Sequence, residues 1–228
     1  MQSLEKIAVF DFCETLVPFQ SADKFVDYIY SHNKTIRSSV WRFVYRLLGL
    51  ICFLRFCNRY WPNLSIGKRL MTKQLKGINE TRMNVLANDF YEHCIKPCLI
   101  PDVIKELSTR REEGFIIVLV SGGFDVYLKF FADDFRISSN HVITTKLEKK
   151  EGLYTGRIEG VDCMRANKVY LLEKVFNRNS CKVLVYSDSY SDLPLFQWAD
   201  ESYVISKNGY VSWANKLNNL KRIIKWEN

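Results

Sequence analysis

Short apolar runs that alternate with helical stretches constrain the fold of this chain more than any other feature. Four runs are rich in β-branched and aromatic residues: residues 6–12, 115–120, 182–186 and 202–205. Continuous apolar runs of this length are typical of strands that are buried on both faces of a parallel sheet. Helical patterns at residues 102–113 and 167–176 precede the second and the third run. The alternation therefore predicts a Rossmann-like, doubly wound α/β core.

Two segments depart from this alternation. Residues 142–158 contain two strand-like stretches around a turn at Glu151 and Gly152, which predicts a small β-hairpin. Residues 18–99 have helical periodicity and few strand signals, so we expect an all-helical cap inserted after the first strand. The expected domains are a core formed by residues 1–17 and 100–228 and a cap formed by residues 18–99.

Polar residues gather where the predicted strands end, and ligands of open α/β sheets bind at that edge. The candidates are Asp11, Thr15, Ser121, Gly122, Asp188 and Asp192, together with Lys168 at the start of a predicted helix. Clustered carboxylates require a hard cation such as Mg²⁺. A hydroxyl, glycine amides and a lysine suit a phosphoryl group. Singly these are ordinary turn, cap or surface residues, but the set predicts a phosphoryl-transfer site.

Four motifs carry a family resemblance: DFCET at 11–15, VSGGF at 120–124, ANKVYLLEKV at 166–175 and YSDSYSDLPLF at 186–196. In order and spacing they resemble the haloacid dehalogenase superfamily, in the phosphoserine phosphatase-like branch (subfamily IB) with a type 1 helical cap. The resemblance covers nearly the whole chain. It implies a Mg²⁺-dependent phosphatase that acts on a small phosphorylated metabolite through an aspartyl-phosphate intermediate.

The resemblance also assigns roles to single residues. Asp11 is the expected nucleophile, and Thr15 is expected to support the loop that carries it. Ser121 and Lys168 are expected to bind the phosphoryl oxygens, with help from the backbone amide near Gly122.

The resemblance implies a Mg²⁺ site formed by Asp11, the backbone carbonyl of Cys13, Asp188 and Asp192, the last as a ligand or through water. The family has a second aspartate where this chain has Cys13. In the family, that carboxyl group protonates the leaving oxygen and later activates water. A thiol with a pKa of about 8.5 here replaces an acid with a pKa of about 4. Cys13 is therefore expected to be a poor base for the attacking water.

Three outcomes of this substitution stay open. Another group carries the proton and hydrolysis is slow or specialised, or the aspartyl phosphate is long-lived and passes to an acceptor other than water. In the third, the protein binds its ligand with little turnover. We expect slow or specialised hydrolysis, because the other catalytic positions are intact. The alternatives are a phosphotransferase and a non-catalytic protein that binds anions or nucleic acid.

The net charge of +8 comes from the predicted cap. Residues 28–79 contain no acidic residue and ten basic ones: Lys34, Arg37, Arg42, Arg46, Arg55, Arg59, Lys68, Arg69, Lys73 and Lys76. The aromatic residues among them include Trp41, Phe43, Tyr45, Phe53, Phe56, Tyr60 and Trp61. A cap with an aromatic core and a solvated basic rim explains the pattern. A surface for a phosphorylated substrate or an anionic membrane explains it equally, so a lipid-phosphate phosphatase with peripheral membrane contact stays open.

The substrate and the setting follow from a few further features. Gln20 is neutral where phosphoserine phosphatases have an acidic residue that binds the substrate amine, so phosphoserine is not the expected substrate. Arg69 and Lys73 are candidates to bind substrate from the cap. Nucleic acid is not an expected partner, because no recognised motif is present.

The seven cysteines show no repeated spacing and the N-terminus runs straight into a strand, so we expect a cytoplasmic protein, with peripheral membrane contact left open. The apolar run at 47–54 is shorter than the roughly 20 residues that a membrane span needs. The sequence does not indicate an oligomeric state.

Overall fold

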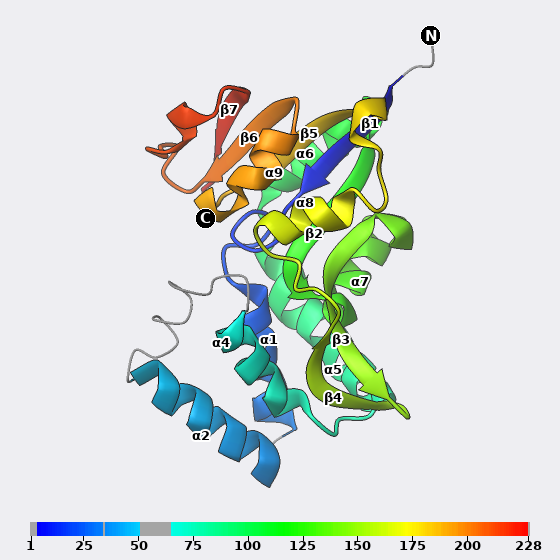
Figure 1. Ribbon diagram of the computed structural model, residues 1–228, viewed down its shortest axis with the longest axis vertical. Coiled ribbons are helices and arrows are strands. Elements are labelled where there is room, and N and C mark those ends of the chain that lie inside the picture. Colours follow the sequence, from blue (N-terminus) through cyan, green and yellow to red (C-terminus); the bar gives the residue numbers. More distant parts are fainter. Residues whose placement is uncertain (1–3, 34, 51–64, 228) are drawn as a thin grey trace.

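The computed structural model describes residues 4–33, 35–50 and 65–227 (Figure 1). Its core is a seven-stranded sheet with the strand order β4-β3-β2-β1-β5-β6-β7. The strands are β1 (Glu5–Phe10), β2 (Ile116–Phe124), β3 (Val142–Lys150), β4 (Leu153–Glu159), β5 (Cys181–Ser187), β6 (Glu201–Ser206) and β7 (Leu220–Lys225). All neighbouring strands run parallel except β3 and β4, which form an antiparallel hairpin.

The central strand β1 pairs with β2 on one side and with β5 on the other. Its alternate residues belong to two hydrophobic clusters: Ala8 and Phe10 to one, Ile7 and Val9 to the other. Both faces of the strand are therefore buried, which explains its continuous apolar run. Helices α6 (Pro101–Glu112) and α7 (Asp125–Asp134) contribute to the first cluster and cover one face of the sheet. Helices α8 (Ala166–Leu172) and α9 (Leu193–Trp198) contribute to the second cluster and cover the other face. The predicted Rossmann-like α/β core is confirmed.

A second group of helices lies beyond the carboxyl ends of the parallel strands (Figure 1). Its members are α1 (Ser21–His32), α2 (Ile36–Leu50), α4 (Ile66–Met71) and α5 (Glu80–Phe90), with the 3₁₀ turn η2 (Thr72–Leu75) between α4 and α5. The chain leaves the core and returns to it at one place, because the Ile100 N–H donates to the Leu16 carbonyl at 2.9 Å. These helices therefore form an insert between β1 and α6.

The β3–β4 hairpin extends from the edge of the sheet to this insert (Figure 1). The Gly77 N–H donates to the Tyr154 carbonyl at 2.8 Å, and the Tyr154 N–H donates to the Ile78 carbonyl at 2.9 Å. Gly156 in β4 has a φ of 72°, and a Cβ added there would lie 3.1 Å from the Cα of Lys73. Only glycine combines this backbone conformation with so close an approach. The insert is thus joined to the core by backbone contacts as well as by side chains.

Several details differ from the sequence prediction or lie beyond it. The predicted hairpin turn is confirmed, with Glu151 and Gly152 both at positive φ. Helix α8 ends at Leu172, because the chain then turns and buries Phe176 in the second hydrophobic cluster. Strand β7, which extends the sheet beside β6, was not predicted.

Part of the basic aromatic segment lies outside the described residues, namely Lys34, Phe53, Arg55, Phe56, Arg59, Tyr60 and Trp61. Within the described ranges, no helix is long and apolar enough to cross a membrane. Arg42 forms an ion pair with Asp27 at 2.6 Å and lies over the ring of Tyr30, so this member of the segment has partners within the protein.

Candidate active site

Asp11 follows β1 directly, at the end of the central strand. Its backbone N–H donates to the carbonyl of Tyr186 at 2.9 Å, which ties the first loop to β5. The carboxylate is buried, and its Oδ1 lies 3.0 Å from Nζ of Lys168. Burial raises the pKa of Asp11 to about 6, although the charge of Lys168 opposes the rise. The predicted nucleophile is therefore a desolvated carboxylate held beside a buried cation.

Lys168 lies near the start of α8, after Arg165 at a φ of 55°. Its Nζ is 2.7 Å from Asp192 Oδ2, which also accepts a hydrogen bond from the Ser187 hydroxyl at 2.6 Å. Burial disfavours the charged ammonium, but Asp11 and Asp192 outweigh this effect and raise the pKa of Lys168 above its usual range. Lys168 therefore stays protonated and acts as a fixed positive charge between two carboxylates.

Asp188 and Thr15 form a second contact between the first loop and the end of β5. The Thr15 hydroxyl donates to Asp188 Oδ1 at 3.0 Å, and the Asp188 N–H donates back to the Thr15 hydroxyl at 3.1 Å. Burial and the nearby charge of Asp11 raise the pKa of Asp188 to about 7. Two carboxylates with raised pKa values therefore share this edge of the sheet.

This pair of carboxylates fits a hard divalent cation. Burial raises the pKa of both carboxyl groups, and the charge of Asp11 raises that of Asp188 further, so a cation between the two would stabilise their ionised forms. Mg²⁺ usually takes one or two protein carboxylates and completes its shell with water and substrate oxygens. Among the described residues, no three acidic, histidine or cysteine side chains form a metal cluster. Asp192 contacts Lys168 and Ser187 through Oδ2.

Cys13 lies in the first loop, and its side chain hydrogen-bonds to Ser21. The Ser21 N–H donates to its sulfur at 3.4 Å, and the Ser21 hydroxyl lies 3.1 Å from the same atom. The Ser21 hydroxyl also bonds the Tyr127 hydroxyl at 2.7 Å. Burial and the charge of Asp11 raise the pKa of the Cys13 thiol above its ordinary value. Cys13 is therefore a protonated thiol at neutral pH.

The end of β2 forms a closely packed glycine loop. Ser121 is fully buried, and its hydroxyl accepts the Gly123 N–H at 2.9 Å. A Cβ added at Gly122 would lie 2.9 Å from the Met164 side chain, and one at Gly123 would lie 2.7 Å from the Tyr127 hydroxyl. Both positions therefore favour glycine, and the half-buried Gly122 keeps the loop close to the cavity.

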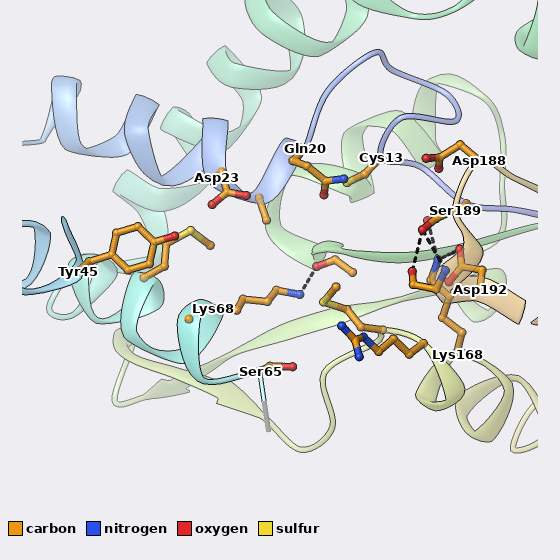
Figure 2. Close-up of a pocket in the computed structure, with 18 residues that line it drawn as sticks. Cys13, Gln20, Asp23, Tyr45, Ser65, Lys68, Lys168, Asp188, Ser189 and Asp192 are labelled. Atoms are coloured by element: carbon orange, nitrogen blue, oxygen red, sulfur yellow. Dashed lines mark hydrogen bonds and ion pairs between the residues drawn. The ribbon is translucent and has the colours of Figure 1, made fainter. Parts of the chain in front are cut away.

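These groups surround a cavity of about 290 Å³ between the sheet edge and the insert (Figure 2). Asp11, Cys13, Gly122, Lys168, Asp188 and Asp192 line it, as does Gln20, whose amide donates to Glu14 at 2.6 Å. Ser121 and Thr15 are fully buried and do not line it, although Thr15 bonds the lining residue Asp188. The structure thus brings the predicted core residues together.

Lys68 is the cap cation in this cavity, and sequence reasoning did not select it. Figure 2 shows its side chain extending from α4 toward the glycine loop. Its ammonium donates to the Gly122 carbonyl, to the Thr145 hydroxyl at 3.0 Å and to Asp162 at 2.5 Å. Arg69 and Lys73 do not line the cavity. Only the rotation of α4 relative to the core distinguishes Lys68 from its neighbour Arg69, and no local sequence signal fixes that rotation.

Known proteins share both the sequence pattern and the fold of this chain. A family model for haloacid dehalogenase-like hydrolases matches residues 8–197. A protein of unknown function from Bordetella pertussis Tohama I has a TM-score of 0.74 at 22% identity, over 89% of this chain and 91% of that chain. A phospho-aspartyl intermediate analogue of phosphoserine phosphatase has a TM-score of 0.63 at 17% identity, over 97% and 96% of the two chains. A probable phosphoserine phosphatase from Vibrio cholerae has a TM-score of 0.64 at 15% identity, over 96% and 60%. Among curated proteins, none matches this sequence.

The matched range includes the strand that carries Asp11, the glycine loop, Lys168 and both aspartates after β5. The solved structures, among them phosphoserine phosphatases, have the same overall fold as this chain. The chain therefore belongs to the haloacid dehalogenase-like hydrolases, and its fold is similar to that of phosphoserine phosphatases.

Proposed function

We propose that this hydrolase is a Mg²⁺-dependent phosphatase that transfers the phosphoryl group of a small monoester to Asp11 and then to water. The observation that carries the proposal is the buried Asp11–Lys168–Asp192 array at the end of the central strand. Such an array leaves one carboxylate oxygen able to attack while a fixed cation compensates the charge. The name of the phosphoserine phosphatase neighbours supports the same class of reaction.

The proposed first step forms a bond between a carboxylate oxygen of Asp11 and phosphorus as the bond to the leaving oxygen breaks. Lys168 and the backbone amides around Gly122 hold the equatorial phosphoryl oxygens. Mg²⁺ held by Asp11 and Asp188 would supply further positive charge against these oxygens. Thr15 holds Asp188 in place for this purpose through its two hydrogen bonds.

The second step is where Cys13 matters. The leaving oxygen needs a proton, and the attacking water later needs a base, yet Cys13, at the position expected to transfer these protons, is a thiol with a raised pKa that is bonded to Ser21. The thiol is able to donate a proton, but it is a weak acceptor of one at neutral pH. Formation of the aspartyl phosphate is therefore expected to be faster than its hydrolysis. A long-lived aspartyl phosphate also leaves time for transfer to a bound alcohol, so a phosphotransferase is the second candidate.

The volume and the charged lining of the cavity limit the kind of substrate that it can hold. A volume of about 290 Å³ suits a small phosphorylated metabolite rather than a phosphoprotein. Lys68 and Asp23 are the charged cap side chains that line it, so a substrate with its own polar groups is expected. The described cysteines are all free thiols, which supports a reducing, cytoplasmic setting.

The test is a phosphate-release screen over sugar, polyol, amino-acid and lipid phosphates, with Mg²⁺ and with a chelator. Wild type, Asp11→Asn and the control Asp133→Asn, an exposed aspartate of α7, are compared. We expect release from at least one substrate class that needs Mg²⁺ and is lost only in Asp11→Asn. Mass spectrometry of acid-quenched samples should find phosphate on the peptide that contains Asp11. Equal activity of Asp11→Asn and wild type would refute the proposal.

A further inference from the structure

A second concave site lies between the insert and the hairpin. Its volume is about 330 Å³. Four cations line it: Arg37 from α2, Lys76 after η2, Lys150 from β3 and Arg157 from β4. It shares no lining residue with the catalytic cavity. No step of the proposed reaction uses it.

The charges in this site are unbalanced within the protein. Among the described residues, none of the four lining cations forms an ion pair, whereas neighbouring Lys149 pairs with Glu80 at 2.5 Å. Glu148 is the single lining carboxylate, and it accepts a hydrogen bond from the Thr155 hydroxyl. Lys73 adds a fifth cation at the border, where partial burial and then the charges of Arg157 and Lys76 lower its pKa. Like charges gathered in a concavity favour a bound anion over an empty site.

The backbone holds these cations in a fixed arrangement. The pairing of Gly77 and Ile78 with Tyr154 sets the strand β4 directly against the chain that carries Lys76. The close approach at Gly156 sets Lys73 against the same strand, one residue from Arg157. The backbone segments that carry Lys73, Lys76 and Arg157 are therefore held close together before any ligand binds, which lowers the part of the entropic cost that comes from bringing them together.

We infer that this site binds a phosphate group carrying two or more negative charges, either on a small soluble anion or on an anionic lipid headgroup. We refer to it as the cap–hairpin site, formed by Arg37, Lys73, Lys76, Lys150 and Arg157. Arginine and lysine together suit such a group, since arginine offers a planar fork of donors and lysine a compact charge. A ligand here would contact both the insert and the core, outside the catalytic cavity.

The test uses full-length protein and two probes, inorganic pyrophosphate and phosphatidylcholine vesicles with or without phosphatidic acid. Amide NMR titration separates this site from the catalytic one, because Gly77 and Thr155 report on the first, and Gly122 and Gly123 on the second. The double variant Lys76→Gln/Lys150→Gln is compared with Lys105→Gln/Lys216→Gln, which removes the same charge from exposed lysines of the core. Vesicle binding is measured by co-sedimentation.

The expected result is a saturable shift of the Gly77 and Thr155 amides with pyrophosphate. The affinity should fall about tenfold in Lys76→Gln/Lys150→Gln and stay within twofold of wild type in the control. If the source is a lipid headgroup, the same tenfold loss appears in binding to vesicles that contain phosphatidic acid. The inference is overturned if neither probe binds, or if both double variants weaken binding equally. Neither outcome depends on phosphatase activity, so failure here leaves the proposed function untouched.

Discussion

The ion pair between Lys68 and Asp162 offers a quantitative test, because it joins the insert to the core in a buried setting. The two side chains are 10% and 2% exposed. In Lys68→Met, Asp162 Oδ1 keeps only the Thr145 hydroxyl at 2.7 Å, and Oδ2 has no hydrogen-bond partner among the described residues. Removal of one member of a buried pair typically costs about 3–5 kcal/mol. We expect the lower end, about 3 kcal/mol, since Lys68 is slightly exposed.

Urea unfolding followed by circular dichroism measures this loss at unchanged m value. For a chain of this size, it corresponds to a fall in Tm of roughly 6–12 °C. The double variant Lys68→Met/Asp162→Asn should lose less than the sum of the two single variants, with a coupling of at least about 1.5 kcal/mol. Lys105→Met, at an exposed lysine, should stay within about 0.5 kcal/mol of wild type. Additive single losses would refute the reasoning, because the two charges would then not be interacting.

Three further predictions follow from the site and the hairpin. Cys13→Asp should raise the steady-state rate of phosphate release by about 10²-fold, since it restores a carboxyl group for proton transfer. Cys13→Ser is the control, and an equal rise in its rate would contradict the explanation. Lys168→Met should lower kcat/KM by about 10³-fold, because the phosphoryl oxygens lose a fixed charge; retention of activity in a steady-state assay would exclude that role. Gly156→Ala should lower the free energy of unfolding by about 1–3 kcal/mol, and Gly160→Ala should lower it less. Both residues have positive φ, but of the two only Gly156 lies close to the backbone of another segment. Equal losses of stability in calorimetry would argue against the close contact.

Much of the fold could be predicted from the sequence, because local patterns determine it. Residues 7–10 are all apolar since both faces of β1 are buried there, and this signal requires no knowledge of its neighbours. Asp11 and Asp188 follow such strands, so their meeting at one edge follows from parallel topology. Strand β7 was missed because LKRIIK mixes charged and apolar residues at the edge of the sheet, where exposure removes the apolar signal.

Other parts of the site depend on contacts that no local pattern specifies. Lys68 enters the cavity because α4 packs with one particular rotation, which long-range contacts with Gly122 and Asp162 stabilise. The orientation of Asp192 toward Lys168 likewise arises from a contact across twenty-four positions of the chain. The cap–hairpin site combines residues from three segments, each of which looks like an ordinary solvated charge when taken alone.

The hydrogen bond between Ile100 and Leu16 has a consequence for how such chains diversify. The two ends of the insert already meet, so the core closes at this point whatever lies between them. The chain entropy lost on closing a loop grows only logarithmically, by about 0.6 kcal/mol for each doubling of length. An insert here can therefore lengthen, shorten or be replaced at little cost to the folding of the catalytic core. Substrate choice can change by remodelling the insert, while the carboxylates and the lysine that perform the chemistry stay in place.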